Sequence, residues 1–341
     1  MKEKFLTLAI ETSCDETSAA VLEGGRKVLS NIISSQIDIH KIYGGVVPEI
    51  ASRHHLENIN GVINLALDEA GIKLKDIDLI GVTKGPGLVG ALLVGIATAK
   101  ALSLSLDKPL VGVHHLKGHV SSNFIQYPDL KPPFLSLIVS GGHTGLVEVC
   151  DYNRYSLLGS TRDDAVGEAY DKVARVLGLG YPGGPKIDKL ATEGRKDAIT
   201  FKRVYLEKDS YDFSFSGIKT GVLNYVNSQK QKGLFYREAD LAAGFQEAVL
   251  EVLVEKTVKA AKKTGYKKIA VAGGVAANSR LRSLLEEACE REDFQLYIPS
   301  IVLCTDNAAM IGSAAYYLYK KGVEDDLTMD AYANLDLEED R

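Results

Sequence analysis

Cysteines are few and far apart in this sequence. The four of them, Cys14, Cys150, Cys289 and Cys304, form no C-x-x-C pair. Because thiolate zinc sites and disulfide frameworks need characteristic cysteine spacings, the sequence argues against both and favours a reducing, cytoplasmic location. The chain also has no G-x-x-x-x-G-K-[ST] sequence, which excludes a P-loop nucleotide site of its own.

Long hydrophobic runs are scarce as well. The apolar run at residues 5–10 stops at Glu11 and is too short for a secretory signal, so we expect none. Residues 88–106 form the one longer run, which contains Lys100 and follows a predicted strand. We therefore predict a helix buried on all sides, not a membrane span, and expect no membrane partner.

Length and charge indicate a globular protein with more than one lobe. The chain has 341 residues, more than the roughly 250–300 at which one hydrophobic core stops growing. The net charge is −5, but residues 324–341 contain eight acids and one base, so this tail carries −7 and the remainder +2. We expect a solvated, partly disordered tail and a body whose charge does not exclude nucleic acid.

The predicted elements occur twice in the same order. The first half has strands at 5–10, 18–22 and 27–34, a helix at 52–70, a strand at 78–83, a helix at 88–106 and a strand at 109–114. The second half has strands at 134–139, 146–150 and 155–160, a helix at 163–177, an insertion, then elements at 237–264 (helix), 268–272 (strand), 278–291 (helix), 294–298 (strand) and 306–320 (helix). In the helix at 52–70, we expect Leu56, Ile59, Ile63 and Leu67 on the core face.

Each half begins with a strand, a turn rich in hydroxyl or glycine residues, and a returning strand. Two such turns facing each other could clamp a phosphate with backbone N–H groups. The arrangement resembles the actin, hexokinase and heat-shock-70 ATPase superfamily, an α/β fold with two lobes and a central nucleotide and metal cleft. The alternative is a pair of unrelated hairpins.

The segment from His114 to His119 is the clearest candidate for a metal site. His115 and His119 are four residues apart, so in a helix both imidazoles lie on one face. Together with a carboxylate such as Asp306 they would form a set typical of catalytic divalent metals. Two partly exposed histidines at a strand end are the alternative. A zincin protease is disfavoured, because Leu116 stands where that motif needs glutamate.

Two glycine-rich turns carry different predictions. Residues 85–90 match G-x-G-x-x-G, but no acid ends the next strand, so we interpret these glycines as packing positions and not a dinucleotide site. Residues 270–278 read as strand, glycine turn and helix start, with Asn278 able to cap the helix or to contact an adenine or ribose. Paired with residues 140–143, this turn indicates a nucleotide site within one lobe.

Two further segments leave alternatives open. Asp171 and the turn from Tyr181 to Asp188 could bind sugar hydroxyls or an amine, or could be a surface acid and a capped loop. Residues 195–237 hold nine basic and four acidic residues interleaved with aromatics. That mixture suits looped nucleic acid or a subdomain with its own aromatic core. Its aromatics are Phe201, Tyr205, Tyr211, Phe213, Phe215 and Tyr225.

Seven motifs in chain order resemble one family, the tRNA N6-threonylcarbamoyladenosine transferases, once described as O-sialoglycoprotein endopeptidases. They are at residues 10–17 (IETSCDET), 114–119 (HHLKGH), 139–144 (VSGGHT), 181–185 (YPGGP), 213–220 (FSFSGIKT), 272–275 (AGGV) and 304–307 (CTDN). The resemblance spans nearly the whole chain and looks bacterial. It implies an N-terminal lobe at 1–130 completed by a helix at about 306–322, a C-terminal lobe at 131–305 with an insertion at about 190–237, and an acidic tail at 323–341.

The resemblance also implies a ligand set. His115, His119 and Asp306 would hold one divalent metal, usually Fe²⁺ and sometimes Zn²⁺, and ATP with Mg²⁺ can also take part. Asp15 and Glu16 would occupy the first phosphate turn as candidates for catalysis. The binding site for threonylcarbamoyl-adenylate would be lined by Ile138, Val139, Ser140, Gly141, Gly142, Asp171, Gly184, Asp188 and Asn278.

The implied reaction moves the threonylcarbamoyl group from that adenylate to N6 of the adenosine just 3′ of the anticodon, in tRNAs that read codons beginning with A. The implied partners are tRNA, a dimerising paralogue of the same fold, a small P-loop ATPase and a separate synthase that makes the adenylate. Since the mixed anhydride is already activated, no protein nucleophile is needed, and Asp15 or Glu16 could accept the proton of the attacking amine.

Two other functions fit the fold. A small-molecule kinase would hold Mg²⁺ through carboxylates and phosphates instead of paired histidines. A scaffold resembling the paralogous partner would have no use for His115, His119 and Asp306 together. The histidine pair therefore favours the transferase.

Overall fold

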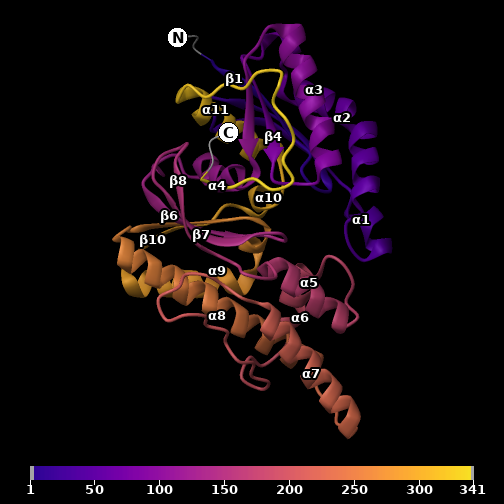
Figure 1. The fold of residues 1–341 in the computed structure, drawn as a ribbon, viewed down its shortest axis with the longest axis vertical. Helices are drawn as coiled ribbons and strands as arrows, with labels where there is room; N and C mark the ends of the chain where they lie inside the picture. Colours follow the sequence, from indigo (N-terminus) through magenta and orange to yellow (C-terminus); the bar gives the residue numbers. More distant parts are fainter. Residues whose placement is uncertain (1–3, 339–341) are drawn as a thin grey trace. The chain divides into compact units, whose positions relative to one another are not determined.

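The computed structural model describes residues 4–338, and its contacts divide the chain into two compact units (Figure 1). Unit 1 comprises Met1–Pro132, Val149–Ser156 and Pro299–Arg341. Unit 2 comprises Pro133–Glu148 and Leu157–Ile298.

Unit 1 is built on a five-stranded sheet with the order β3-β2-β1-β4-β5. The strands are β1 (Leu6–Glu11), β2 (Glu16–Glu23), β3 (Lys27–Ser35), β4 (Leu79–Gly85) and β5 (Leu110–His114). β1 pairs antiparallel with β2 and parallel with β4, and every residue of β1 is buried. A strand buried on both faces reads as a continuous apolar run, which is how β1 was found in the sequence.

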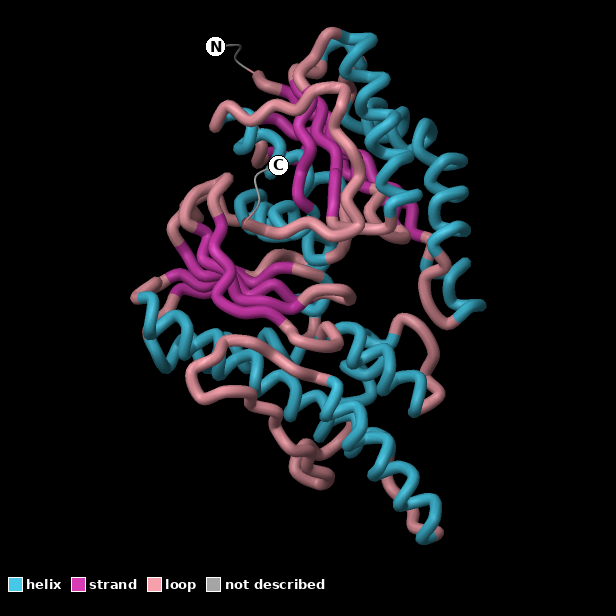
Figure 2. The backbone as a smooth tube through the Cα atoms, viewed as in Figure 1, coloured by secondary structure: helices cyan, strands magenta, loops and turns pink. Residues whose placement is uncertain are grey.

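Helices cover both faces of this sheet (Figure 2). On one face lie α2 (Pro48–Ala70) and α3 (Val89–Leu106), which pack on Leu8 and Ile10. On the other lies α11 (Ala308–Lys320), which packs on Ala9 and has α4 (His115–Gln126) beside it. Short α1 (Ile37–His40), η1 (Lys41–Tyr43), η2 (Leu74–Asp76) and α10 (Ile301–Cys304) connect these elements.

Two predictions about α2 and α3 are wrong. Leu56 is 69% exposed, because the core face of α2 is set by Ile59 and Ile63 together with the buried His55. α3 buries only one face, through Ala91, Leu92, Gly95, Ile96 and Ala99. The opposite face exposes Val89, Leu93 and Leu104. This helix has the length and hydropathy of a membrane span, but a helix lying on a sheet passes the same test.

Unit 2 repeats the architecture with the strand order β10-β9-β6-β7-β8. Its strands are β6 (Phe134–Val139), β7 (Thr144–Val149), β8 (Tyr155–Ser160), β9 (Lys268–Ala272) and β10 (Gln295–Tyr297). With β6 to β10 matched to β1 to β5, the two orders are identical, which confirms the predicted duplication. The helices are α5 (Val166–Val176), α6 (Gly183–Ala191), α7 (Ser216–Lys232), α8 (Glu238–Thr264) and α9 (Ser279–Glu292), with η3 (Gly274–Ala277) after β9.

The insertion has its own aromatic core. Phe201, Tyr211, Phe213 and Phe215 are buried, and Tyr205 is half exposed. The structure therefore favours the packing interpretation of these aromatics over base stacking. The sequence analysis did not predict α7, which is mostly polar and has only three buried residues.

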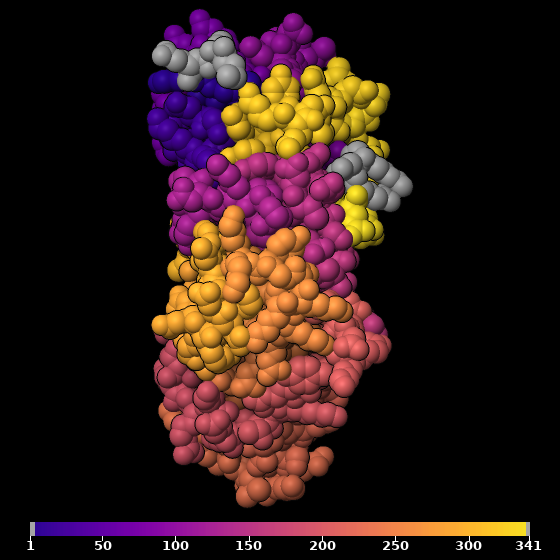
Figure 3. Space-filling model, turned by 90° about the vertical axis from the view of Figure 1, so that its left-hand side faces the viewer, coloured from indigo at the N-terminus to yellow at the C-terminus, as the bar shows by residue number. Residues whose placement is uncertain are grey.

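The acidic tail packs against unit 1, contrary to the prediction of a solvated, partly disordered segment. The Asp325 carboxylate lies 3.2 Å from Lys84 Nζ and accepts a hydrogen bond from the Gly112 N–H at 2.8 Å. Met329 enters the core beside α3. In Figure 3 the C-terminal segment (yellow) lies directly on the atoms of the N-terminal part of the chain. Of the predicted tail, residues 339–341 lie outside the described part.

Candidate metal centre and nucleotide site

The histidine pair lies where β5 ends and α4 begins. The imidazole of His114 caps α4, since its Nδ1 accepts a hydrogen bond from the Leu116 N–H at 3.1 Å. The helix therefore starts at His115, and the four-residue spacing places the rings of His115 and His119 on one face, 4.6 Å apart between centroids. Both side chains are buried.

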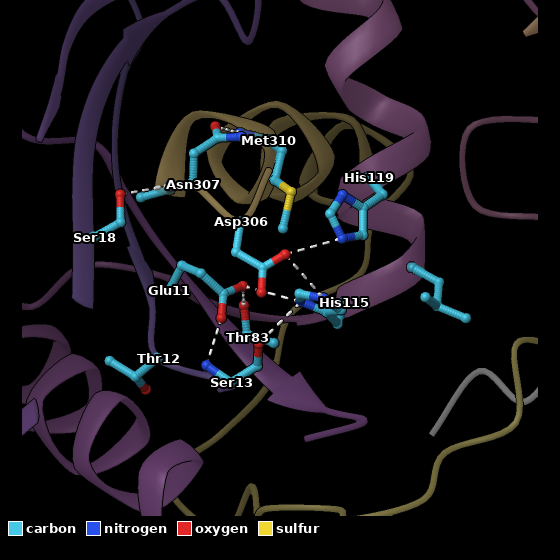
Figure 4. A network of polar contacts seen from close by, with 12 residues as sticks. Glu11, Thr12, Ser13, Ser18, Thr83, His115, His119, Asp306, Asn307 and Met310 are labelled. Carbon is cyan, nitrogen blue, oxygen red and sulfur yellow. Dashed lines mark hydrogen bonds and ion pairs between the residues drawn. The ribbon is translucent and has the colours of Figure 1, made fainter. Parts of the chain in front are cut away.

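Asp306 comes to the same place from the far end of the sequence. The predicted helix at 306–320 begins two residues late, because Asn307 caps α11 by accepting a hydrogen bond from the Met310 N–H. Asp306 thus sits in the preceding loop and faces the histidines (Figure 4). Its Oδ1 lies 3.1 Å from His119 Nε2 and 3.6 Å from His115 Nε2. One ligand atom from each of the three residues lies within 4.8 Å of the others.

The donor atoms fit a divalent metal. Metal–ligand bonds of about 2.0–2.1 Å at tetrahedral or octahedral angles separate the ligand atoms by roughly 2.8–3.4 Å, close to the distances of 3.1 and 3.6 Å from Asp306. His119 is only 1% exposed, its Nδ1 has no hydrogen-bond partner among residues 4–338, and its Nε2 has only the Asp306 carboxylate at 3.1 Å within the same part of the chain. Leaving buried polar atoms unpaired is costly, so this imidazole is arranged for a ligand that the protein alone does not supply.

Charge is concentrated around His115. Burial opposes protonation of the ring, but the negative charges of Asp306 and Glu11 outweigh burial and raise the pKa of His115 to about 9. A metal binding at this position therefore displaces a proton from the ring. Burial also acts to raise the pKa of Glu11, but the charge of His115 and its hydrogen bond keep that pKa below the ordinary value.

The sequence analysis did not select Glu11 as a site residue. It is the last residue of β1 and is fully buried, and its carboxylate accepts hydrogen bonds from the Ser13 N–H at 2.5 Å and the Thr83 hydroxyl at 2.6 Å. The sequence did contain an indication of its role, because Glu11 directly follows a continuous apolar run. An acid at such a position must either leave the core or find hydrogen-bond donors inside it.

The predicted catalytic acids lie in the turn after β1. Asp15 is buried, and its backbone carbonyl accepts a hydrogen bond from the Gln36 N–H. The Glu16 carboxylate accepts one from the Ser35 hydroxyl at 3.1 Å. Burial first, and then the charges of Asp306 and Asp15, raise the pKa of Glu16 to about 10. A protonated Glu16 cannot act as a base, although a cation beside Asp306 would offset part of this shift.

In unit 2, the predicted nucleotide-binding residues gather at the carboxyl ends of β6 and β9. Ile138 pairs with Ala272 in a parallel ladder, and the next residues, Val139 and Ser140, face the turn at Gly273. Gly273 has φ of +94°, and a Cβ there would lie 2.4 Å from the Val139 carbonyl oxygen, so only glycine fits. This edge of a parallel sheet is where α/β proteins bind ligands.

The turn after β6 leaves donors exposed. The Ser140 N–H donates to the His143 carbonyl at 2.8 Å, and the Ser140 hydroxyl accepts from the His143 N–H at 3.0 Å. Within the described chain, the N–H groups of Gly141 and Gly142 have no protein acceptor, and both residues are exposed. Two adjacent exposed N–H groups are available as donors to an anion.

Three predicted polar residues hold helix starts in place at this edge. Asp171 accepts a hydrogen bond from the Gly183 N–H at 2.6 Å, at the start of the helix that contains Gly184. Asp188 accepts from the N–H and hydroxyl of Ser279. The amide of Asn278 caps α9 and donates to Gln246. Both amide groups of Asn278 are therefore engaged, which supports its capping role.

The strand order and its repetition define the class of protein. Over 94% of this chain, the structure is similar to HypF of T. kodakarensis, with a TM-score of 0.65 at 16% identity and 48% of that chain covered. It is also similar to component A of the Acidaminococcus fermentans (R)-2-hydroxyglutaryl-CoA dehydratase, with a TM-score of 0.53 at 17% identity, covering 93% of this chain and 98% of that one. The fold is that of the actin-like ATPases.

Sequence comparison narrows the class to one family. A family model described as tRNA N6-adenosine threonylcarbamoyltransferase matches residues 27–313. A protein of that name from Clostridium botulinum is 59% identical over 339 residues, 99% of this chain and 100% of its own. One from Clostridioides difficile is 59% identical over 331 residues, 97% and 98% of the two chains. The chain belongs to the tRNA N6-adenosine threonylcarbamoyltransferase family, which makes it a transferase.

Proposed function

We propose that the protein transfers the threonylcarbamoyl group of threonylcarbamoyl-adenylate to N6 of the adenosine next to the anticodon in tRNA, in the cytoplasm, with release of AMP. The observation that carries this proposal is the convergence of His115, His119 and Asp306 from distant parts of the chain. Membership of the threonylcarbamoyltransferase family supports this reaction as the one that a metal bound by these three residues would serve.

The two units have different roles in this proposal. At the strand ends of unit 2, the free N–H groups of Gly141 and Gly142 bind the phosphate of the adenylate, and the helix starts held by Asp171, Asp188 and Asn278 shape the surface for its nucleoside. Since these side chains are already hydrogen-bonded, they contribute a rigid surface without reorganisation on binding.

Unit 1 holds the metal in this proposal. Two imidazoles and one carboxylate with open positions are the set that favours Fe²⁺, and the same set accepts Zn²⁺. When bound, the metal supplies Lewis-acid polarisation of the carbonyl under attack. Asp15 and Glu16 are the two candidates to accept the proton of the adenosine amine.

The kinase alternative is not favoured. Phosphoryl transfer uses magnesium bound by oxygen ligands, whereas the convergent set in unit 1 supplies two nitrogens. The relatives that match nearly the whole chain are named transferases of tRNA modification.

The test is a transfer assay with purified protein, threonylcarbamoyl-adenylate, unmodified tRNA and the partner proteins. We expect H115A and H119A to lower the rate more than the roughly 10–100-fold that is typical of changes behind a metal ligand. H54A is the matched control, since His54 is another histidine of unit 1 and, among the residues that the structure describes, its ring pairs with Glu57 on α2 alone. Full transfer by H115A would contradict the proposal.

We also propose a surface for the paralogous partner that the family resemblance implies. Val89, Leu93 and Leu104 form one exposed apolar stripe on α3, and unpaired apolar stripes of this kind mark interaction sites. A same-fold partner can present the equivalent helix to it. Binding of ATP with Mg²⁺, the small P-loop ATPase and the separate synthase remain assigned by the resemblance alone.

An assay of complex formation tests this surface. We expect L93E to abolish co-elution with the paralogue, because burying a carboxylate without a partner is strongly unfavourable. L157E is the control, as Leu157 is exposed to a similar degree, 41% against 45%, but belongs to unit 2. Equal binding by L93E and wild type would remove α3 from the interface.

A further inference from the structure

The carboxylates of Glu11 and Asp306 both point toward His115 (Figure 4). Oε2 of Glu11 is 3.2 Å from His115 Nδ1, whereas Asp306 faces Nε2 of the same ring. We propose that Glu11 is a positioning residue that fixes the tautomer and orientation of His115, so that Nε2 is presented to the metal. The inference rests on the metal centre of the proposed function and adds a residue to it.

The hydrogen bonds of Glu11 define the tautomer. An ionised carboxylate can only accept hydrogen bonds, so the proton between Glu11 and His115 is on Nδ1. Ser13 Oγ lies 3.2 Å from the same nitrogen, and as a hydroxyl it can accept or donate. With Nδ1 protonated, the lone pair available for a metal is that of Nε2, which lies 3.6 Å from Asp306 Oδ1.

Three elements hold Glu11 itself in place. It is anchored at the end of β1, and the Ser13 N–H of the following turn donates to Oε1 at 2.5 Å. The Thr83 hydroxyl of β4 donates to Oε2 at 2.6 Å. All three residues are buried. A carboxylate held by donors on two sides cannot rotate away, so the imidazole that donates to it is also fixed.

The two histidines differ in this respect. Within residues 4–338, Nδ1 of His119 has no hydrogen-bond partner, whereas Nδ1 of His115 has the Glu11 carboxylate as acceptor. Carboxylates that accept from the far nitrogen of a metal-binding histidine orient the ring and raise its basicity, and their loss typically weakens metal binding about 10–100-fold. Of the two histidines, His115 is therefore the one whose ring orientation is fixed, through its hydrogen bond to Glu11.

The test measures metal affinity and not catalysis. The full-length protein is stripped with a chelator and titrated with Zn²⁺ against a chromophoric competitor, and separately with Co²⁺, whose visible absorption bands report ligand geometry. We expect E11A to weaken Zn²⁺ binding about 10–100-fold and to change the Co²⁺ spectrum. E11Q should recover part of the affinity, because the amide oxygen still accepts the Nδ1 proton.

A second pair of variants guards against misfolding of E11A. T83V removes one donor to Glu11 and should weaken Zn²⁺ binding in the same direction by a smaller factor. T7V is its control, since Thr7 is also buried in this sheet but its hydroxyl has no partner within the described residues. Thermal unfolding of the metal-free variants shows which of them are folded, and T83V against T7V decides the question if E11A is not.

The outcomes separate this inference from the proposed function. If wild type binds neither Zn²⁺ nor Co²⁺, the proposed metal centre and the proposed role of Glu11 are both wrong. If wild type binds and the folded Glu11 and Thr83 variants match it, only the positioning role is wrong. An E11Q that binds as weakly as E11A also overturns the inference, because the acceptor oxygen would then not matter.

Discussion

Buried polar atoms carry most of the functional information at the scale of single residues. His119 is almost fully buried on α4 and its Nδ1 has no partner within the described residues, which destabilises the metal-free fold by about 1–3 kcal/mol. A protein keeps such a side chain where a ligand completes it. The stability of unit 1 and its metal binding are therefore linked through this residue.

Replacing His119 with leucine tests that link. H119L removes the unpaired Nδ1 at similar volume, but it also removes the contact of Nε2 with Asp306. Because these two effects oppose each other, the metal-free variant should unfold at about the same temperature as metal-free wild type. Wild type should gain about 2.7 kcal/mol when free Zn²⁺ reaches 100 times its dissociation constant, whereas H119L should gain nothing. Thermal unfolding with and without Zn²⁺ measures both effects. A Zn²⁺-dependent rise for H119L would contradict the assignment of His119 as a ligand.

At the scale of helices and strands, the sequence predicted an element correctly wherever its apolar residues followed one clear pattern. Continuous apolar runs predicted β1, β6 and β9 within a residue, because both faces of these strands are buried. The predicted core face of α2 included Leu56 and omitted His55, since an apolar periodicity cannot show that a histidine is paired with Thr17 and the Cys14 carbonyl inside the core.

The metal centre, like the helices and strands, could be predicted only where a local sequence pattern existed. The spacing of His115 and His119 follows from the helix period, but their approach to Asp306 depends on the contacts of α11 with α4, for which the sequence has no local signal. Glu11 was missed because its role depends on donors from β4, 72 residues away. The family resemblance supplied Asp306; periodicity alone could not.

One ion-pair cluster joins elements of unit 2 and makes its stability depend on pH. The Glu247 carboxylate on α8 accepts two hydrogen bonds from Arg280 of α9, each at 2.8 Å, and one from Lys196. Arg280 is the main reason that the pKa of Glu247 falls to about 2. A lowered carboxylate pKa stabilises the fold above the unfolded value, about 4.5, and this contribution is lost as the pH falls toward 2.

We therefore expect E247Q to lose about 2–3 kcal/mol at pH 7. The difference from wild type should shrink as the pH is lowered from 5 toward 2. The measurement is chemical unfolding at a series of pH values. E287Q is the control, because Glu287 is 62% exposed and lies 3.6 Å from the same arginine, so its loss should cost about 0.5 kcal/mol or less. Equal effects of the two variants would show that burial of Glu247 is unimportant.

On the scale of the whole molecule, the C-terminal segment from Pro299 onward belongs to unit 1, the unit that the N-terminal part of the chain begins. The acidic tail closes onto β4 and β5, where the Tyr332 N–H donates to the Lys84 carbonyl and His114 Nε2 lies 3.1 Å from the Leu335 carbonyl. Since His114 caps α4, the tail also touches the helix that carries both histidines. The described part of the tail is therefore held on unit 1 by backbone contacts as well as by the Asp325 carboxylate.

Asp325 is the residue through which this closure is best tested. D325A leaves the partly buried Lys84 ammonium and the Gly112 N–H without their carboxylate, which should cost about 2–4 kcal/mol. Hydrogen exchange followed by mass spectrometry should show faster exchange in β4, β5 and residues 324–335, with unit 2 unchanged. D326A is the matched control, because Asp326 is exposed and, in the described part of the chain, its carboxylate bonds only to Thr328 of the tail. If D325A and D326A exchange alike, the tail is not held by the Lys84 pair, and the apolar contact of Met329 must account for its position.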